Sequence, residues 1–330
     1  MVMVTSVGIC GTDWEIHMGL YGEAPPGEER LILGHENLGR VAALGEGATG
    51  VEVGDYVVST VRRPDDCANC QRGESDMCSA GGYRERGIKG IHGFMAEFYT
   101  ERTEYLVKIP RELRGAAVLL EPLSVVEKAL YQSMKIQERM VWSPKRALVL
   151  GAGPIGLLAT ALLRLRGVET YTLARRPATS PKARLVQEMG ATYLDGMESP
   201  VPTLKDKLGN LDFIIEATGN SGVAFQAMSI LGVNGVLCLT GVSGGNGTME
   251  VPTDDINLQM VLGNKVVFGT VNANLRDFEK GVQHLGEIEG RWPALAERFF
   301  THRYSLSQIS EAFEASNSSD SIKVILDVSP

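Results

Sequence analysis

The sequence predicts an α/β protein with two domains, a small β-barrel followed by a doubly wound parallel sheet. Its 330 residues are too many for one typical core and suit about two domains of roughly 100–200 residues each. Up to about residue 120, short β-like runs alternate with glycine turns, whereas from about residue 145 apolar strand-like runs alternate with segments of helical length. A β-rich half followed by an alternating β/α half indicates two domains with different roles.

The first half contains the stretch LGRVAALGEGATGVEVGDYVVSTV, in which glycines separate runs of Val, Ala and Tyr. This pattern is typical of a small closed barrel with tight turns. The glycines are Gly39, Gly45, Gly47, Gly50 and Gly54.

In the second half, five continuous apolar runs bounded by turns predict buried parallel strands. These runs are RALVLGAG, VETYTLA, LDFIIEATG, NGVLCLTGV and NKVVFGTVN. The last ~55 residues contain the helical pattern ANLRDFEKGVQHL and the strand pattern IKVILDVS, which fit neither end of such a sheet well. We therefore expect a first domain over 1–130, a parallel-sheet domain over 131–272, and a segment over 273–330 that returns to the first domain.

Composition narrows the classes of partner. Apolar residues make up 44% of the chain and the formal net charge is −8, so we expect an acidic surface that repels nucleic acid and anionic lipid. No apolar run reaches the ~18 residues that a membrane span needs, and the opening residues show no basic flank before an apolar core. The sequence thus favours a soluble cytoplasmic protein that acts on small molecules.

The stretch ALVLGAGPIG predicts a dinucleotide site, because Gly151, Gly153 and Gly156 directly follow an apolar strand and open an apolar helix. Such glycines provide a tight turn, close approach of backbone to pyrophosphate, and close packing of helix on strand. The first turn of the helix that begins with Pro154 and Ile155 offers unpaired N–H groups to phosphate, although proline itself has none. The alternative is a purely structural glycine turn, but the strand and helix that the motif requires are both present.

The end of the second strand of this domain indicates which dinucleotide fits. An NAD site usually has Asp or Glu there, which accepts bonds from the ribose 2′-hydroxyl. This chain has Ala174, followed by Arg175 and Arg176, and guanidinium groups suit a 2′-phosphate. We expect NADP to be preferred over NAD. The alternative is a pair of solvated arginines on a turn.

Two glycine-flanked turns carry candidate zinc ligands, Cys10 in GICGTD and His35 in GHENLGR. Cys, His and carboxylate groups bind zinc, and three such groups with one open position form a catalytic site. Taken singly, each would be interpreted as a buried structural residue. Together with Glu36 and the dinucleotide motif, they indicate a metal centre.

The remaining cysteines form a separate group. Cys67, Cys70 and Cys78 lie together in CANCQRGESDMC, whereas Cys238 stands alone. An odd number of cysteines in a large chain without a secretion signal favours thiols or metal ligands over disulfides.

The order of the motifs carries a family resemblance. GICGTD, GHENLGRV, a glycine-rich barrel, the cysteine group, HGFMAEF, EPLSVVEKAL and GAGPIG follow one another along nearly the whole chain. In this order they resemble the zinc-dependent medium-chain alcohol and polyol dehydrogenases, and within that family most resemble the microbial glucose 1-dehydrogenases. The resemblance implies a GroES-like β-barrel as catalytic domain and a Rossmann fold as dinucleotide domain.

The resemblance also implies roles in the catalytic centre. Cys10, His35 and Glu36 would hold the catalytic zinc, with Thr12 beside the reacting hydroxyl. Glu121, at the start of the helix in EPLSVVEKAL, would be a further zinc ligand that yields to water or sugar, held there by a proline that fits the first helical turn. The alternative for Glu121 is a helix-start carboxylate favoured by the helix dipole.

Further residues would bind the sugar and the cofactor. Glu85 in YRERGIKG matches a carboxylate that binds sugar hydroxyls, and Asn272 in GTVNAN matches an amide between nicotinamide and sugar. Such polar groups suit sugars because each hydroxyl both donates and accepts. The implied substrate contacts are Thr12, Glu85, Glu121 and Asn272. The implied cofactor contacts are Gly151, Gly153, Pro154, Ile155, Gly156, Arg175, Arg176, Thr218, Gly219 and Asn272.

The cysteine group corresponds to a structural zinc lobe in this family, where four cysteines are usual. The chain keeps the last three but has Pro64 where the first should be. Asp65 or Asp66 could supply an oxygen ligand instead, or the lobe could hold three unligated thiols.

Two further departures concern the start of the chain. Cys10 lies about thirty residues closer to the first residue than in relatives, so we expect either a start assigned too late or a barrel without its opening strands, with exposed strand edges. The histidine that relays protons in many relatives is Glu15 here, with His17 nearby, and the relay residue stays open.

The function expected from the resemblance is zinc-dependent oxidation of an aldose, glucose or galactose, at C1 to the lactone, with hydride transfer to NADP or NAD. Relatives are commonly dimers or tetramers, so we expect a homo-oligomer. One alternative is a dehydrogenase of another polyol, threonine or a simple alcohol. A second is a nucleotide-binding protein with a dead site, against which the retained ligand residues argue.

Overall fold

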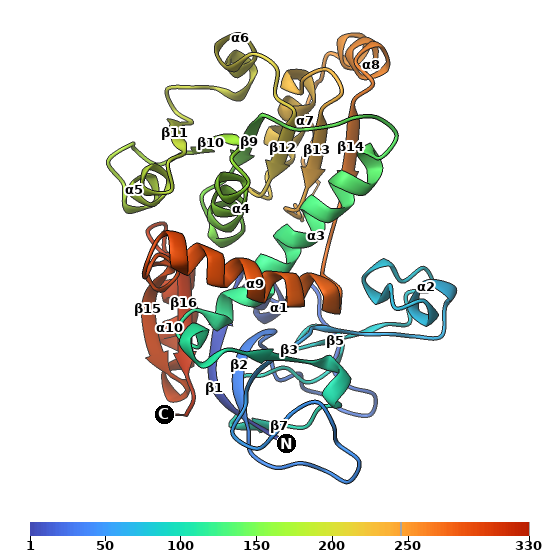
Figure 1. The fold of residues 1–330 in the computed structure, drawn as a ribbon, viewed down its shortest axis with the longest axis vertical. Coiled ribbons are helices and arrows are strands. Elements are labelled where there is room, and N and C mark those ends of the chain that lie inside the picture. Colours follow the sequence, from blue (N-terminus) through green and yellow to red (C-terminus); the bar gives the residue numbers. More distant parts are fainter. Residues whose placement is uncertain (245, 330) are drawn as a thin grey trace. The chain divides into compact units, whose positions relative to one another are not determined.

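The computed structural model describes residues 1–244 and 246–329. The chain divides into two compact units, one formed by residues 1–127 and 272–330 and the other by residues 128–271 (Figure 1). The C-terminal segment therefore belongs to the same unit as the N-terminal part. Within the described ranges, no helix is both long enough and apolar enough to cross a membrane.

Unit 1 is organised around strand β1 (Val2–Ile9), whose inward-facing valines and isoleucine are buried. The sheet order is β15-β16-β1-β2-β3-β8, with β7 also paired to β1. The last strand, β16 (Lys323–Asp327), pairs antiparallel with β1, so the two ends of the sequence lie side by side in one sheet (Figure 1). The other strands are β2 (Glu36–Val41), β3 (Tyr56–Ser59), β7 (Phe98–Tyr99), β8 (Leu106–Ile109) and β15 (Phe300–Ser305).

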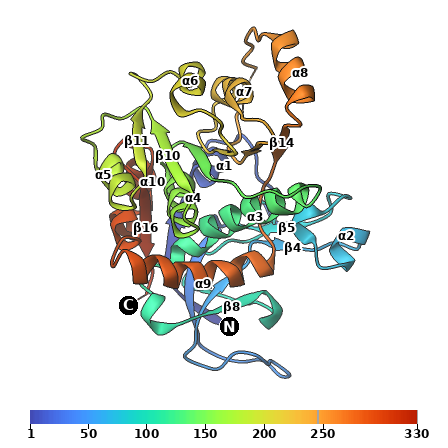
Figure 2. The ribbon, with the colours of Figure 1, turned by 45° about the horizontal axis from the view of Figure 1, so that its top comes forward.

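A second, three-stranded sheet in unit 1 consists of β4 (Arg62–Arg63), β5 (Arg84–Arg86) and β6 (Gly90–Ile91). The turn after β5 packs against a second turn, because a Cβ at Gly87 would lie 2.5 Å from the carbonyl oxygen of Gly34. Only glycine allows this approach at a φ of +70°. Between β4 and β5 the chain forms a small lobe with α2 (Ala68–Gln71) and the 3₁₀ turn η1 (Ser75–Met77), which stands out from its unit in both views (Figures 1 and 2).

Unit 1 contains further helices besides α2. They are α1 (Gly11–His17), α9 (Leu275–Arg291) and α10 (Ile309–Ser316), while α3 (Leu120–Gln137) has residues 120–127 in this unit. Buried His284 on α9 lies 2.5 Å from buried Glu127 on α3. The short 3₁₀ turns are η2 (Thr103–Tyr105), η3 (Arg111–Leu113), η4 (Ala117–Leu119), η6 (Glu297–Phe299) and η7 (Leu306–Gln308).

Unit 2 contains a six-stranded parallel sheet in the order β11-β10-β9-β12-β13-β14. Numbered within the unit, this order is 3-2-1-4-5-6, the doubly wound arrangement that binds dinucleotides. The strands are β9 (Arg146–Leu150), β10 (Glu169–Ala174), β11 (Thr192–Asp195), β12 (Phe213–Glu216), β13 (Val236–Leu239) and β14 (Val266–Gly269). The parallel sheet confirms the predicted fold class, and the five predicted runs are β9, β10, β12, β13 and β14.

The helices of unit 2 connect these strands (Figure 2). They are α4 (Pro154–Leu165), α5 (Pro181–Glu188), α6 (Leu204–Leu208), α7 (Ser221–Ile230) and α8 (Thr253–Leu262), with the 3₁₀ turn η5 (Val201–Thr203). The core on one side of the sheet joins Leu148, Ile214 and Leu237 from neighbouring strands. Strand β11 escaped sequence analysis because its four residues, TYLD, contain no continuous apolar run.

Candidate active site

Cys10 is fixed in place by the start of helix α1. It is the N-cap residue, and the backbone N–H of Thr12 donates to its Sγ at 3.3 Å. In return, the backbone N–H of Cys10 donates to Oδ2 of Asp13 at 3.0 Å. This reciprocal capping arrangement satisfies two backbone donors. The local sequence CGTD therefore holds both a thiol and a buried carboxylate at the end of β1.

His35 follows a turn that only glycine can make. Gly34 has a φ of +91°, and a Cβ there would lie 2.8 Å from the side chain of Met95. The Gly34 N–H donates to Oδ1 of Asp13 at 3.1 Å. As a result, Nε2 of His35 lies 3.1 Å from Sγ of Cys10, and its Nδ1 lies 3.3 Å from Oδ1 of Asp13.

Two carboxylates complete what we call the buried cluster, formed by Cys10, His35, Glu36 and Glu121. Ligand atoms of His35, Glu36 and Glu121 all lie within 4.8 Å of one another. Glu36 begins β2, and the absence of a side chain at Gly8 makes room for it, since a Cβ there would lie 2.1 Å from Oε2 of Glu36. Glu121 is the second residue of α3.

Asp13 and Lys323 contribute to this cluster, although sequence analysis did not identify them. Lys323 is buried on β16, and its ammonium group donates to both carboxylate oxygens of Glu36 at 2.6 Å. These two residues are 287 positions apart, so no local pattern could connect them. Asp13 had a usable signal, because it stands three residues after the helix-capping Cys10.

The charges of the cluster shift one another's protonation. Burial raises the pKa of Glu121 to about 7, and the neighbouring Glu36 carboxylate adds to this effect. Burial would lower the pKa of His35, but the negative charges of Cys10 and Asp13 outweigh it and raise that pKa well above its ordinary value. Burial likewise opposes the charged form of Lys323, yet Glu36 raises the pKa of the ammonium group. The cluster is thus rich in negative groups that favour a cation.

The donor set of the buried cluster fits zinc. A cysteine sulfur and an imidazole nitrogen 3.1 Å apart, with carboxylates beside them, are the ligand types of catalytic zinc sites. Asp13 faces the far nitrogen of His35, where a carboxylate commonly fixes the tautomer and orientation of a zinc-binding imidazole. His35 therefore presents Nε2, on the Cys10 side, to the ion.

The residues expected to bind sugar form a pair in unit 1. The side-chain amide of Asn272 donates to Oε1 of Glu85 at 2.6 Å, and both residues are buried. Asn272 has a φ of +60°, a conformation that asparagine tolerates better than most residues. Glu85 lies two residues before Gly87, whose turn packs on Gly34. The carboxylate is thereby held on a segment adjoining the His35 turn.

The cysteine lobe, residues 65–78, gathers a second set of metal-type ligands. Side-chain atoms of Asp65, Cys67, Cys70 and Cys78 all lie within 4.8 Å of one another. Oδ2 of Asp65 is 3.0 Å from Sγ of Cys78, and backbone N–H groups of Cys70 and Ser79 lower the pKa of Cys67 to about 6. Of the two aspartates that sequence analysis left open, Asp65 is the one in the cluster.

The glycine motif of unit 2 has the geometry of a phosphate site. Gly151 has a φ of +109°, and a Cβ at Gly156 would lie 2.0 Å from the carbonyl oxygen of Gly151. Gly153 is the N-cap of α4, with Pro154 and Ile155 in its first turn. Apart from atoms of the adjoining residues, no described atom lies within 4 Å of a Cβ built on Gly153. The helix N-terminus is therefore open to a phosphate.

The other expected cofactor residues also lie at the ends of strands. Arg175 and Arg176 directly follow β10 (Glu169–Ala174), and across 1–244 and 246–329 neither guanidinium group is in an ion pair. After β12, Thr218 donates its backbone N–H to buried Glu216 at 2.7 Å, and Gly219 has a φ of +66°. All these residues lie at the carboxyl ends of parallel strands, where doubly wound sheets bind ligands.

Comparison with known proteins adds independent evidence. The family model for the alcohol dehydrogenase GroES-like domain matches residues 1–111. The family model for the glucose dehydrogenase C-terminus matches residues 115–328. The glucose 1-dehydrogenase of Methanocella arvoryzae is 48% identical over 99% of this chain and 91% of that protein. The glucose 1-dehydrogenase of Thermoproteus tenax is 45% identical over 98% of this chain and 89% of that protein.

A solved structure resembles the whole chain. Haloferax mediterranei glucose dehydrogenase, in complex with NADP, Zn and gluconolactone, is 37% identical and has a TM-score of 0.91. The match covers 100% of this chain and 92% of that one. These findings confirm the GroES-like and Rossmann folds predicted from the sequence. The chain belongs to the glucose dehydrogenase family of medium-chain alcohol dehydrogenases.

Proposed function

We propose that the protein is a zinc-dependent glucose 1-dehydrogenase, which oxidises the C1 hydroxyl of an aldose to the lactone and transfers hydride to NADP⁺. The observation that carries the proposal is the buried cluster, which sets the Cys10 thiol, the His35 imidazole and two carboxylates together in unit 1. The relative of known structure binds NADP, Zn and gluconolactone, the cofactor, metal and product that this reaction requires.

Within the cluster, Cys10, His35 and a carboxylate of Glu36 or Glu121 would hold the ion. Zinc bound there supplies Lewis acidity, which lowers the pKa of a sugar hydroxyl and stabilises negative charge on its oxygen. Lys323 balances the charge of Glu36, so Glu121 is the carboxylate with less compensation. Thr12, the second residue of α1, would accept the hydrogen bond of the reacting hydroxyl.

Glu85 and Asn272 would orient the sugar. A carboxylate accepts from hydroxyls, and an amide both donates and accepts, so the pair can bind the mixed donors and acceptors of an aldose. A simple alcohol offers no second hydroxyl to such a pair. The buried position of both residues makes an unpaired group costly, which favours a polyhydroxylated substrate.

In unit 2, the open N-terminus of α4 at Gly153 would receive the pyrophosphate of the cofactor. Arg175 and Arg176 would bind the 2′-phosphate of NADP, because arginine can hold phosphate through parallel charge-assisted bonds. Replacing both arginines with glycine should raise the Michaelis constant for NADP⁺ far more than that for NAD⁺. An unchanged ratio of the two constants would reject this assignment.

The cysteine lobe would hold a second, structural zinc, with Asp65 taking the place of the missing first cysteine. This part of the proposal is supported by the four clustered ligand atoms, since a closed tetrahedral set holds a loop that has little core of its own. Elemental analysis should give two zinc ions per chain. A value near one that falls to zero in a variant without Cys10 would mean that the lobe holds no metal.

Assembly and location complete the proposal. We propose a homo-oligomer, which the family resemblance implies, and a reducing compartment such as the cytoplasm, because free thiols in the lobe are needed to bind metal.

A substrate panel tests the main proposal. Zinc-loaded protein should reduce NADP⁺ with glucose or galactose faster than with polyols, threonine or simple alcohols. If a polyol or alcohol proved the better substrate, the sugar assignment would be wrong. If no substrate were turned over with either cofactor, the enzyme assignment would be wrong.

A further inference from the structure

Arg62 makes an unusual set of contacts with the expected sugar-binding carboxylate. Its Nε and Nη2 both donate to Oε1 of Glu85, at 3.0 and 2.9 Å. The guanidinium carbon also lies 3.8 Å from the ring centre of Tyr83. Arg62 is buried, as is Glu85, and charge-assisted bonds of this kind are stronger and more directional than neutral ones.

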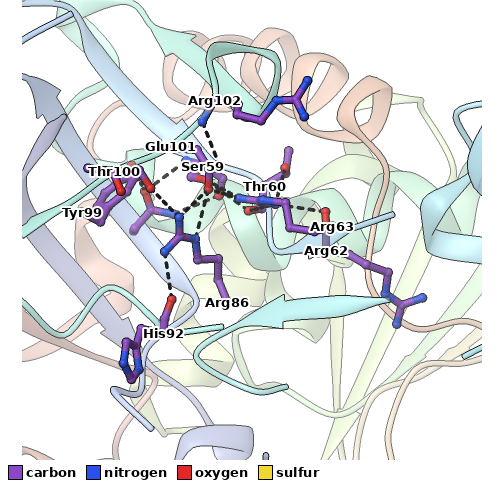
Figure 3. A network of polar contacts seen from close by, with 11 residues as sticks. Ser59, Thr60, Arg62, Arg63, Arg86, His92, Tyr99, Thr100, Glu101 and Arg102 are labelled. Carbon is purple, nitrogen blue, oxygen red and sulfur yellow. Dashed lines mark hydrogen bonds and ion pairs between the residues drawn. The ribbon is translucent and has the colours of Figure 1, made fainter. Parts of the chain in front are cut away.

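The neighbouring arginine of β4 has a separate set of partners. Arg63 bonds Glu101, which also accepts from Arg86 at 2.9 Å. Figure 3 shows Arg62 directed away from this group, as expected for adjacent residues of a strand. The two neighbouring arginines are similarly buried but pair with different carboxylates. Of these two carboxylates, only Glu85 is an expected sugar contact.

The donors leave one oxygen of Glu85 available. Oε1 accepts both bonds from Arg62 and the bond from the amide of Asn272. Among the residues that the structure describes, none donates to Oε2. Rotation of the carboxylate would break three bonds at once, so Oε2 keeps one direction. A fixed acceptor oxygen of this kind suits a sugar hydroxyl, because less orientation is lost on binding.

Arg62 also connects Glu85 to the cysteine lobe. Its Nη1 donates to the carbonyl oxygen of Asp76 at 3.0 Å. In addition, the side-chain amide of Asn274 donates to the carbonyl oxygen of Gly73 and to Oδ1 of Asp76, the latter at 3.2 Å. Asn274 lies two residues after Asn272. Both members of the Glu85–Asn272 pair are therefore tied to residues 73–76 of the lobe.

We propose that Arg62 is a positioning residue for substrate, which orients Glu85 so that Oε2 faces a sugar hydroxyl and which anchors this carboxylate to the cysteine lobe. The inference rests on the proposed function, because it needs Glu85 to contact the sugar. The inference also assigns a second role to the lobe. Carbonyl groups of residues 73–76 accept hydrogen bonds from Arg62 and Asn274, which in turn position the residues expected to bind the sugar.

Steady-state kinetics of Arg62→Gln, with Arg63→Gln as the matched control, test the proposal. Arg62→Gln should raise the Michaelis constant for glucose about tenfold or more, the scale of losing a hydrogen bond to a charged group, with a much smaller change in kcat and in the Michaelis constant for NADP⁺. Arg63→Gln should lower the thermal unfolding temperature but leave the Michaelis constant for glucose within about twofold. Arg62→Lys should recover part of the loss, since lysine can still donate to Glu85.

A binding measurement separates this inference from the proposed function. Calorimetric titration of glucose into zinc-loaded enzyme saturated with NADPH gives an affinity without turnover, and Arg62→Gln should weaken it by the same factor as the Michaelis constant. Equal effects of the Arg62 and Arg63 variants, or an unchanged glucose affinity in a folded Arg62 variant, would overturn the inference. If wild-type protein neither bound nor oxidised glucose, the proposed function itself would fail.

Discussion

The buried cluster and the cysteine lobe gather similar ligand atoms by opposite means. The buried cluster joins residues from the end of β1, the start of β2 and the start of α3, and packs His35 and Glu36 against buried Asp13 and Lys323. The lobe gathers its four ligands from fourteen consecutive positions, 65–78, and three of them are only half-buried. The first site is positioned by the fold of the whole unit, whereas the second is a local loop that a metal would itself organise.

This difference predicts that loss of a ligand has different consequences in the two sites. Cys10→Ala should reduce glucose oxidation at least ~100-fold, because losing a metal ligand should exceed the 10–100-fold typical of losing its outer partner, and should remove one zinc without unfolding the protein. Cys78→Ala should instead lower thermal stability and remove the other zinc, while much of the activity persists.

Cys238→Ala is the control for both variants, since Cys238 is buried in the parallel sheet, where burial raises the pKa of its thiol to about 12. It should keep both ions and its activity. If Cys10→Ala retained full turnover, or if Cys78→Ala were as inactive as Cys10→Ala, the division into a catalytic and a structural site would be wrong.

A second prediction concerns the charge that the fold places in the buried cluster. Lys323→Met would leave the Glu36 carboxylate, which is 1% exposed, without its cation, and breaking a buried pair in this way costs about 3–5 kcal/mol. Denaturant unfolding should show this loss. Lys108→Met removes an exposed pair with Asp55 and should change the unfolding free energy by ~1 kcal/mol or less. Similar losses in the two variants would mean that Lys323 has no special role.

A third prediction concerns the outer partner of His35. Asp13→Asn keeps the size of the side chain but removes the negative charge that faces Nδ1 of His35. Zinc affinity of the buried cluster, measured by competition with a chelator, should fall about 10–100-fold. Asp66→Asn, within the lobe but outside its ligand set, should leave both affinities unchanged. An equal fall in the two variants would point to a general effect of charge.

The same contrast explains what could be predicted from the sequence. Cys10 and His35 were identifiable because local glycines and a helix start surround them, and Asp13 was within reach of the same capping pattern. Lys323 was not, because its partner is 287 residues away and the pairing of β16 with β1 exists only in the folded unit. The three glycines of the dinucleotide motif were identifiable because strand, turn and helix are contiguous there.

The lobe illustrates the limit of a spacing rule. The expected position of its first ligand is Pro64, but the backbone places Asp65 in the cluster instead, a shift of one residue that linear spacing left open. Arg62 escaped notice for a different reason: a buried arginine is rare in general, and its partners Glu85 and Asp76 are brought to it by the three-stranded sheet and the lobe. Residues that support a site through long-range contacts have no pattern of their own in the sequence.

The smallest expected effect concerns the ion pairs of Glu101 with Arg63 and Arg86, next to the strand that leads into the cysteine lobe. Arg63, in the strand before the lobe, bonds Glu101, which also faces Arg86 from β5, the hydroxyl of Ser59 on β3 and the backbone N–H of Arg102. Burial would raise the pKa of Glu101, but the charges of Arg63 and Arg86 outweigh it and hold that pKa below its ordinary value.

A carboxyl group whose pKa is lower in the folded than in the unfolded state stabilises the fold at pH values above the unfolded-state pKa, which is near 4.3 for Glu. This stabilisation is lost as the pH falls through the folded-state pKa. Denaturation midpoints of zinc-free protein should therefore fall between pH 5 and pH 3 more steeply for wild type than for Glu101→Gln, which has already lost the contribution. Parallel pH profiles for the two proteins would contradict this role. The arginines on both sides of Glu101 remain charged throughout this pH range, so the difference between the two profiles reports the ionisation of the Glu101 carboxylate alone. This difference should be smaller than the loss of unfolding free energy in Lys323→Met, because that variant leaves Glu36 without its cation.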